Sequence, residues 1–421
     1  MHSNNIKLSA NNNSKLHKKL MLFDLSIYGH HPSYIQHFIE YWNKQNYSGS
    51  LDIVVSPKFI QFHIDVVKMA QECRKNINFI AISTAEEAAL KPRKSGINRN
   101  IRAFQEWSLL CKYATELQAS KCLIMYFDTC LLPLALGRKP PCKFSGIYFR
   151  PTFHYSNFSN YLPNKKQRLQ QWREKFILKR VLSNSHLQTL FCLDPLAIEH
   201  IKKLHAPAKV VYLPDPVALD IDNLPLDNLK QKLKIDSNRK VFLLFGALTG
   251  RKGIYQLLDA VMQLPQELCQ KLCLLFVGEA NAIDKALIEA KIATACQEKP
   301  IQIITQYQFV PDCDMQAYFQ LTDIVLAPYQ RHVGMSGILL LAAAAQKPVL
   351  TSNYGLMGEI VRQYRLGIAV DSTIPEQIAQ GLMQCLEAAP ERIGDRVTMQ
   401  EFAAQNSAEK FAQTLLEHTK N

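Results

Sequence analysis

The sequence has no run of about 18 consecutive apolar residues, the length that a helix needs to cross a bilayer. Its first eighteen residues are polar and Asn-rich and lack the apolar stretch of a secretory signal, so we expect residues 1–18 to form a loose tail. The eleven cysteines include no Cys-x-x-Cys pair. These absences argue against a metal-binding cysteine motif and favour reduced thiols in a cytoplasmic protein.

The chain has 421 residues, 48% of them hydrophobic and 20% charged, which suits two globular domains. Residues 1–215 carry 30 Lys and Arg against 14 Asp and Glu, a net charge of +16, whereas the remaining residues carry 19 against 22. Solvated basic helices explain this excess as well as an anionic partner does. Because no nucleic-acid-binding motif accompanies the charge, the favoured anionic partner is membrane phospholipid or an acidic acceptor, and not nucleic acid.

Short apolar runs alternate with amphipathic stretches along the whole chain, which is typical of parallel sheets covered by helices. In the first half we predict strands at 20–28, 50–56, 77–83, 121–127, 144–149, 189–193 and 209–213. In the second half we predict strands at 240–246, 272–278, 301–305, 323–329, 348–352 and 367–371. The fold class expected is therefore α/β, with two doubly wound, Rossmann-like domains that face each other across a cleft.

The boundary between the two domains is expected in residues 218–239, a polar, proline-containing segment without a strand, which we interpret as a linker. It separates an N-terminal domain at 19–217 from a C-terminal domain at 240–391. Residues 392–421 have helical character and are a candidate to pack back on the N-terminal domain.

The segment "FGALTGRKGIYQLLDAV" (245–261) is a candidate phosphate-binding loop. Gly246 ends a predicted strand, and Arg251 and Lys252 precede an amphipathic helix. Glycines let a backbone approach an anion, a helix N-terminus adds free N–H groups, and an exposed lysine supplies charge. A glycine-rich turn with solvated basic side chains is the alternative interpretation.

The segment "GMSGILLLAAAAQKPVL" (334–350) contains no acid and has the same physical character. Gly334, Met335, Ser336 and Gly337 form a loop whose N–H groups can point at a diphosphate where a helix begins. The following "ILLLAAAA" is apolar on every side, so we expect that helix to be buried. A permissive turn into a buried helix explains this stretch equally well.

Four segments taken in order resemble a known family. They are "FGALTGRKGIYQLLDA", "LLFVGEAN", "QFVPDCDMQAYFQLTDIVLAPY" and "AAAAQKPVLTSNYGLMGEIVRQYRLGIAV". Together they are similar to the C-terminal half of the family 4 retaining glycosyltransferases of the GT-B fold. The resemblance implies transfer of a sugar from a nucleotide-sugar donor, held by the C-terminal domain, to a sugar, lipid-linked or small-molecule acceptor held by the N-terminal domain. It implies neither a metal nor a cofactor.

The resemblance places the loop lysine of the family on Lys252 and its glycine on Gly246. Where an arginine often follows that glycine this chain has Ala247, although Arg251 can supply the second charge. In this family the leaving diphosphate is stabilised without an obligatory protein nucleophile, so we assign that role to Lys252, Arg251 and the loop at 334–337.

The family also has two glutamates eight positions apart, and their places hold Val333 and Leu341 here. The second glutamate usually holds the ribose hydroxyls of the donor, which a leucine cannot do. A degenerate relative that binds a nucleotide or scaffolds a partner is therefore the alternative to an active transferase. Glu359, in "YGLMGEIV", matches an acid common in the family, and a glutamate in the first turn of a helix is its alternative interpretation.

The N-terminal half has candidate residues where its predicted strands end. In "SIYGHHPSYIQHF" (26–38), Gly29 allows a tight turn, and His30 or His31 can contact the acceptor or a donor phosphate. Asp128 and Arg150 follow later strands and can line the cleft, or serve as ordinary cap and turn residues. Asp128 and His31 are the candidates for assisting proton movement at the acceptor hydroxyl.

Residues 164–180, "NKKQRLQQWREKFILKR", contain seven basic residues and a single acid, Glu174. Leu169, Trp172 and Phe176 recur at helical spacing. A basic amphipathic helix of this kind can lie on an anionic bilayer, which would make the protein peripheral at the cytoplasmic face of a membrane. The alternative is that Trp172 and Phe176 anchor the helix to its own domain.

Overall fold

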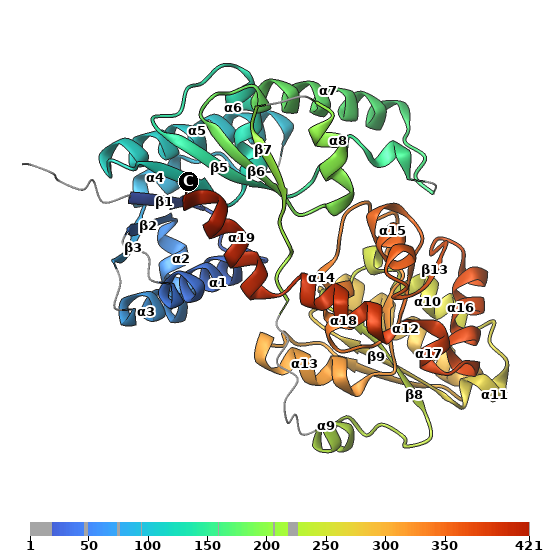
Figure 1. Ribbon diagram of the computed structural model, residues 1–421. Helices are drawn as coiled ribbons and strands as arrows, with labels where there is room; N and C mark the ends of the chain where they lie inside the picture. Colours follow the sequence, from blue (N-terminus) through green and yellow to red (C-terminus); the bar gives the residue numbers. More distant parts are fainter. Residues whose placement is uncertain are drawn as a thin grey trace, which may run out of the picture.

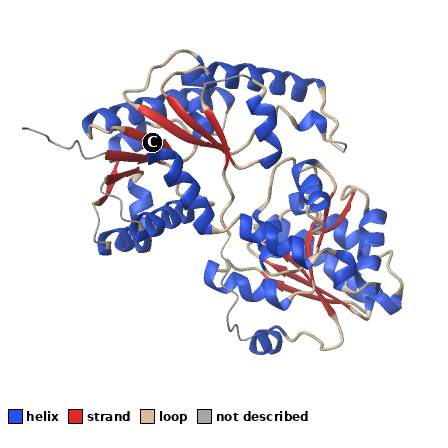
Figure 2. Cartoon of the chain, in the orientation of Figure 1, coloured by secondary structure: helices blue, strands red, loops and turns tan. Residues whose placement is uncertain are grey.

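The computed structural model describes residues 19–45, 49–73, 76–93, 95–158, 160–204, 207–217 and 226–420. Within these ranges the chain forms two α/β domains, each built around its own sheet (Figure 1). Helices surround the strands of both sheets (Figure 2). The predicted tail at residues 1–18 and the first part of the predicted linker, residues 218–225, lie outside the described residues.

The N-terminal domain has a seven-stranded parallel sheet in the order β3-β2-β1-β4-β5-β6-β7. Its strands are β1 (Lys19–Phe23), β2 (Ser50–Val55), β3 (Ile77–Ala81), β4 (Lys121–Ile124), β5 (Lys143–Tyr148), β6 (Leu187–Cys192) and β7 (Lys209–Tyr212). Its helices are α1 (His31–Lys44), α2 (Pro57–Phe62), α3 (Ile64–Glu72), α4 (Thr84–Ala89), α5 (Gly96–Glu116), α6 (Leu131–Ala135), α7 (Lys165–Leu182) and α8 (Ile198–Lys202).

The C-terminal domain has a six-stranded parallel sheet in the order β10-β9-β8-β11-β12-β13. Its strands are β8 (Lys240–Phe245), β9 (Leu272–Val277), β10 (Gln302–Gln306), β11 (Ile324–Ala327), β12 (Val349–Ser352) and β13 (Gly367–Val370). Its helices are α9 (Leu226–Leu233), α10 (Ile254–Val261), α11 (Gln266–Cys269), α12 (Ala282–Glu298), α13 (Asp312–Leu321), α14 (Gly337–Ala344), α15 (Gly355–Gln363), α16 (Pro375–Glu387), α17 (Pro390–Ile393) and α18 (Arg396–Gln405).

The central strands are apolar on both sides because helices cover both faces of each sheet. β9 illustrates this, since all six of its residues are buried. Core clusters lie on either side of both sheets, which is why nearly continuous apolar runs, and not alternating ones, marked the strands in the sequence. The prediction of two doubly wound parallel-sheet α/β domains is confirmed.

The C-terminal segment differs from the single helix expected over 392–421. It forms α17, α18 and a last helix, α19 (Ala408–Lys420). α18 packs on α14 in the C-terminal domain, whereas α19 packs on α1 in the N-terminal domain (Figure 1). Asn406 separates α18 from α19, so only the residues beyond it cross to the first domain.

Part of the predicted linker is also a helix. α9 occupies residues 226–233 and packs against α13, so this stretch belongs to the C-terminal domain. Its Leu233 is buried against the sheet core. The sequence signal for this helix was weak because it is short and mostly polar.

The chain crosses between the domains twice, and the two crossings are bonded to each other. On the first crossing, the Val217 N–H donates to the carbonyl oxygen of Asn406 at 2.9 Å. The Asn406 side-chain oxygen accepts from the Tyr212 hydroxyl at 2.8 Å and from the Asp215 N–H at 3.2 Å. One asparagine therefore joins both connections.

Two further findings concern the described part of the chain. It contains no helix of the length and apolarity required to cross a membrane. Its ten cysteines with described side chains are free thiols, and several are buried in the sheets. Burial raises the pKa of these buried thiols, as it does for Cys130, which keeps them protonated and unreactive.

Candidate functional site

The two sheets place equivalent loops at equivalent positions. β1 lies between β2 and β4, and β8 lies between β9 and β11, so the strand order reverses beside each of them. Open parallel sheets bind ligands at such reversals, outside the carboxyl ends of the strands. The loops that follow β1 and β8 are therefore the places where candidate residues should gather.

Lys252 lies in the loop after β8, in a short 3-10 turn at Gly250–Lys252. Its side chain is only 6% exposed, so the expectation of an exposed lysine is wrong. The ammonium donates to the carbonyl oxygen of Phe245 at 2.8 Å and to the Tyr329 hydroxyl at 2.5 Å. Burial, assisted by the nearby charge of Arg251, lowers the pKa of Lys252 to about 7.

The loop can turn back over the end of β8 because of Gly246. Its φ is +96°, in the region that favours glycine, and an added Cβ would lie 3.0 Å from Nζ of Lys252. The glycine thus gives the lysine the space beneath the loop. The structure brings these two predicted residues together.

Tyr329 joins this loop to the one at 334–337. Its hydroxyl accepts hydrogen bonds from Lys252 and from the Ser336 hydroxyl, the latter at 3.3 Å. The ring is buried, and burial raises the pKa of Tyr329 to about 12, so the phenol stays protonated. Tyr329 was not a sequence candidate; its place just after β11 was the signal that could have found it.

Arg251 is exposed beside the same loop. Its Nη1 lies 3.5 Å from Nδ1 of His332, and the other ring nitrogen of His332 lies 3.2 Å from the carbonyl oxygen of Met335. Its Cζ lies 5.8 Å from the centre of the Tyr329 ring. Arg251 and Lys252 therefore both lie beside the Tyr329 ring, Arg251 exposed and Lys252 buried.

The loop at 334–337 leads into α14, which begins at Gly337. Ser336 occupies the position before the helix, and its side chain does not cap the first turn. The first-turn N–H groups are therefore not occupied by a side-chain cap. Gly334 and Gly337 both have ordinary backbone angles and not a left-handed φ. What these glycines contribute is the space left by the absent side chain. As expected, α14 is largely buried.

The places of the two missing glutamates are apolar in structure as well as in sequence. Val333 and Leu341 both pack against the core of the C-terminal domain. Glu359 lies in the middle of α15, where its carboxylate pairs with Arg362 at 2.6 Å. The alternative interpretation of Glu359 as a first-turn residue is wrong, because α15 begins at Gly355 and has no acid in its first turn.

On the N-terminal domain, a cavity of about 510 Å³ opens where β1 ends. The predicted residues Gly29, His30, His31 and Arg150 line it, together with Tyr126, Phe149, Arg93 and Arg102. None of these last four was a sequence candidate. Gly29 has a φ of +72°, which confirms the tight turn expected there.

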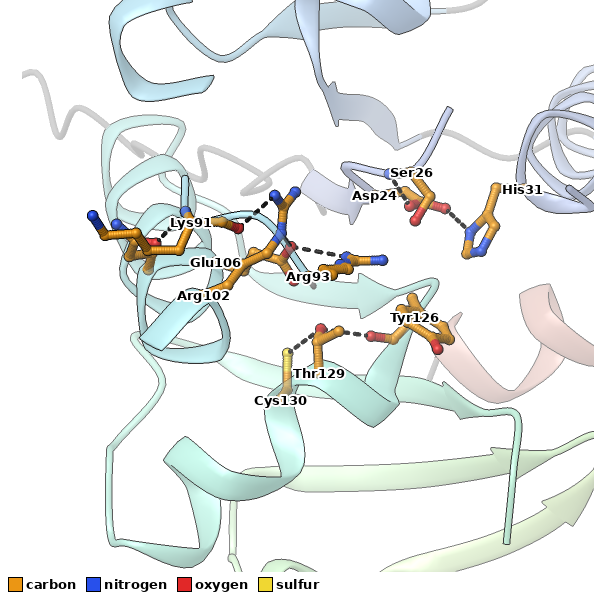
Figure 3. Close-up of polar contacts among 11 residues, drawn as sticks. Asp24, Ser26, His31, Lys91, Arg93, Arg102, Glu106, Tyr126, Thr129 and Cys130 are labelled. Atoms are coloured by element: carbon orange, nitrogen blue, oxygen red, sulfur yellow. Dashed lines mark hydrogen bonds and ion pairs between the residues drawn. The ribbon is translucent and has the colours of Figure 1, made fainter. Parts of the chain in front are cut away.

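His31 is held in a fixed orientation at the start of α1. Its Nδ1 lies 2.7 Å from Oδ2 of Asp24, whose carboxylate also accepts the Ser26 N–H at 2.8 Å (Figure 3). The imidazole ring stacks on Phe149 at 5.5 Å. With Nδ1 bonded to a carboxylate, the second nitrogen, Nε2, is the one able to accept a proton.

Asp128 has a different position from the one expected. Its carboxylate accepts the backbone N–H groups of Phe149 at 2.9 Å and Arg150 at 3.2 Å, and it does not line the cavity. Burial raises the pKa of Asp128 to about 6 despite these bonds. Its place in the structure is thus that of an anchor for the loop carrying Arg150.

The two halves of the site adjoin each other. A Cβ added at Gly337 would lie 3.6 Å from Cε1 of His30, so the histidine of the first domain reaches the loop of the second. Within the described residues, no group of three or more His, Cys, Asp or Glu side chains is placed to hold a metal ion.

Comparison with known proteins identifies related sequences and related folds. Residues 226–404, which make up most of the C-terminal domain, match the family described as "Glycosyl transferases group 1". The narrower assignment to family 4 stays a prediction.

One curated relative is a lipopolysaccharide 1,2-N-acetylglucosaminetransferase of Salmonella typhimurium, with 33% identity over 140 residues. The match covers 32% of this chain and 36% of that protein, so it spans little more than a third of the relative.

Solved structures match almost the whole chain. A glycosyltransferase from Rickettsia africae has a TM-score of 0.64 at 15% identity and covers 96% of this chain and 98% of its own. An Anabaena protein solved in complex with UDP has a TM-score of 0.62 at 13% identity and covers 95% and 98%. At these identities the likeness shows the fold, and it confirms the GT-B arrangement of two facing domains.

Proposed function

We propose that this chain is a glycosyltransferase that moves a sugar from a nucleotide-sugar donor to an acceptor. The C-terminal domain would hold the donor and the N-terminal domain the acceptor. The observation that carries the proposal is the hydrogen-bonded set of Lys252, Tyr329 and Ser336 beside the free start of α14. Burying the charge of Lys252 costs stability, and its two hydrogen bonds, to Phe245 and Tyr329, offset only part of that cost, which supports a role in binding an anion.

The chemistry follows from where negative charge develops. When the bond between sugar and diphosphate breaks, the leaving oxygen becomes anionic, and donors already in place stabilise it without rearranging. Arg251, Lys252 and the first-turn N–H groups of α14 are such donors. The approach of a diphosphate favours the charged form of Lys252, so donor binding takes up a proton where the lysine was neutral.

On the acceptor side, we assign to His31 the removal of a proton from the attacking hydroxyl. Asp24 holds its Nδ1 and stabilises the imidazolium that forms. The proposed reaction proceeds with retention and without a protein nucleophile, metal or cofactor. The resemblance of the C-terminal half to a retaining family supports these features.

The experiment that tests the function is a thermal-shift screen of nucleotide-sugars and nucleotides, followed by an assay of donor hydrolysis. We expect one nucleotide series to raise the unfolding temperature and its sugar conjugate to be consumed slowly in water. Binding without any turnover, even with candidate acceptors, would instead support the degenerate relative. The apolar packing of Val333 and Leu341 is the observation that favours this second function.

The structure also bears on an anionic membrane as a partner. Trp172 and Phe176 on α7 are 67% and 53% exposed and stack on each other, so the alternative in which they anchor the helix is wrong. Leu169 is 65% exposed on the same helix. Buried Gln171, Leu178, Val181 and Leu182 attach α7 to its domain instead.

Glu174, the single acid of the segment, does not offset this exposed basic surface. Its carboxylate accepts hydrogen bonds from Tyr148 and from the backbone and side chain of Thr152, so it faces the domain interior. We therefore include in the proposal that α7 contacts anionic lipid at the cytoplasmic face of a membrane, with its aromatic rings at headgroup depth.

A further inference from the structure

Three arginines from separate segments converge on the cavity of the N-terminal domain. Arg93 comes from the turn after α4, Arg102 from α5 and Arg150 from the loop after β5. They are far apart in sequence, and no motif links them. Their meeting at one cavity is a property of the fold.

Most of the positive charge of this group is not compensated within the protein. Arg93 and Arg102 share a single oxygen of Glu106, at 2.9 and 2.6 Å (Figure 3). Glu106 is 4% exposed, so one buried carboxylate balances two guanidinium groups. The guanidinium of Arg150 forms no ion pair with any residue that the structure describes.

The other carboxylates nearby are already occupied. Asp24 holds His31 and the Ser26 N–H, and Asp128 holds the backbone that carries Arg150. Among the described residues, no Asp or Glu lines the cavity itself. Arg102 also donates from Nη1 to the carbonyl oxygen of Lys91 at 3.1 Å. Within the described residues, the remaining N–H groups of the three guanidinium groups form no other hydrogen bond to a side chain and are available to a ligand.

We propose that this cavity binds an anionic group of the acceptor, a phosphate or a carboxylate, through Arg93, Arg102 and Arg150. The inference rests on the proposed function and adds a substrate class to it. Guanidinium groups suit this task because their planar N–H groups match the oxygens of phosphate and carboxylate in pairs. Figure 3 shows the Arg93 guanidinium extending from Glu106 toward Tyr126, over whose ring its Cζ lies at 5.7 Å.

The position of the cavity fits an acceptor better than a donor. His31 lines the same cavity, and His30 reaches toward Gly337 at the donor loop. An acceptor held by its anionic group would therefore present a hydroxyl between His31 and the donor. The donor diphosphate already has its own cationic groups, Arg251 and Lys252, on the opposite domain.

Arginine modification by phenylglyoxal, quantified at single residues by peptide mass spectrometry, tests the site. The probes are inorganic phosphate, acetate, glucose 6-phosphate and vesicles of phosphatidylglycerol. We expect at least one of them to slow modification of Arg93 and Arg150 several-fold, while Arg99, exposed on the same helix as Arg102, reacts unchanged. Protection by glucose 6-phosphate identifies a soluble phosphosugar, and protection by vesicles alone identifies a lipid headgroup.

A double variant, Arg93→Gln with Arg150→Gln, provides the second arm. It leaves Arg102 to pair with Glu106, so the buried carboxylate keeps a partner. We expect the affinity for the protecting anion to fall about tenfold, since charge-assisted hydrogen bonds are lost, with nucleotide affinity unchanged. Arg99→Gln is the matched control.

Two results would overturn the proposal. One is equal modification of Arg93, Arg150 and Arg99 with and without every probe. The other is that the double variant loses as much affinity for the nucleotide as for the anion. That result would indicate that the arginines bind the donor and not the acceptor. Failure of the proposed function is seen separately, as absence of nucleotide-sugar binding by the unaltered protein.

Discussion

The two domains have the same architecture but carry different side chains in the loop after the strand at which the strand order reverses. In the C-terminal domain that loop buries a lysine under a glycine and adjoins the start of α14. In the N-terminal domain it presents a histidine oriented by a carboxylate, beside three arginines. Sheet topology therefore sets the position of each candidate site, whereas its side chains determine which ligand it can bind.

The domains also differ in charge, and the structure shows where the difference lies. The basic excess of the first half includes α7 and the arginine-lined cavity, on the half assigned to the acceptor. The second half is slightly acidic overall, yet its loop gathers Arg251 and Lys252. Substitutions in the two halves should therefore affect different measurements.

Reversing the charge of α7 should remove binding to anionic vesicles. Each cation near a bilayer surface contributes about 1 kcal/mol, so four reversals lower the partition coefficient on the order of a thousandfold. The variant changes to Glu the four exposed residues Lys165, Lys166, Lys179 and Arg180. Vesicle co-sedimentation at low and high salt measures the effect.

The matched control for this experiment is in the C-terminal half, where Lys232 and Lys271 are exposed. Changing both to Glu should leave vesicle binding nearly unchanged. Equal recovery of the unaltered protein on neutral and anionic vesicles would contradict the role of α7.

Lys252→Met should lower donor turnover about a hundredfold, because a preorganised donor to the leaving group is lost. Met fills the buried space without leaving a charge, so the unfolding temperature should not fall. Initial rates with the donor found by thermal shift measure the effect. Lys271→Met is the exposed control, and turnover within twofold of the original in both variants would remove Lys252 from the site.

Gly337→Val should lower nucleotide affinity about tenfold by keeping the diphosphate away from the start of α14. Among the described residues an added Cβ meets His30, at an ordinary 3.6 Å, so the first atom of the new side chain does not clash. Calorimetric titration gives the affinity. Gly96→Val, at the start of α5 in open space, is the control, and equal losses in both variants would argue against a phosphate loop.

The smallest effect concerns pH. The pKa of Lys252 in the free protein is about 7, and an anion raises it, so binding takes up a proton above pH 7. Nucleotide affinity should then fall about fivefold from pH 7 to pH 8, as expected when one proton is linked to binding. Lys252→Met should abolish this slope. If the pH dependence of nucleotide affinity persists in the variant, another titrating group, such as His332, is responsible for it.

The sequence predicted the fold well because buried parallel strands leave a local signal. Every predicted strand is present, and β9 illustrates why, since its apolar run matches a strand buried on both faces. The start of α14 and the tight turn at Gly29 were likewise visible from their glycines and the apolar run that follows Gly337.

The parts of the site that the sequence did not reveal depend on long-range folding. The burial of Lys252 requires Tyr329, which is 77 residues away. Arg93 and Arg102 look like solvated surface residues until Glu106 and the cavity bring them beside Arg150. Asp128 follows a strand as expected, but its backbone partners could not be inferred from position alone.

Helix α19 has a consequence for how the protein is made. Its Phe411, Ala412, Leu415 and Leu416 are each at most 1% exposed and belong to the core beside β1 and β2. On the ribosome, synthesis runs from the N-terminus, so the first domain emerges with this part of its core uncovered. The hydrophobic core of that domain is complete only after the second domain has been translated. We expect the first half of the chain to depend on chaperones during this interval.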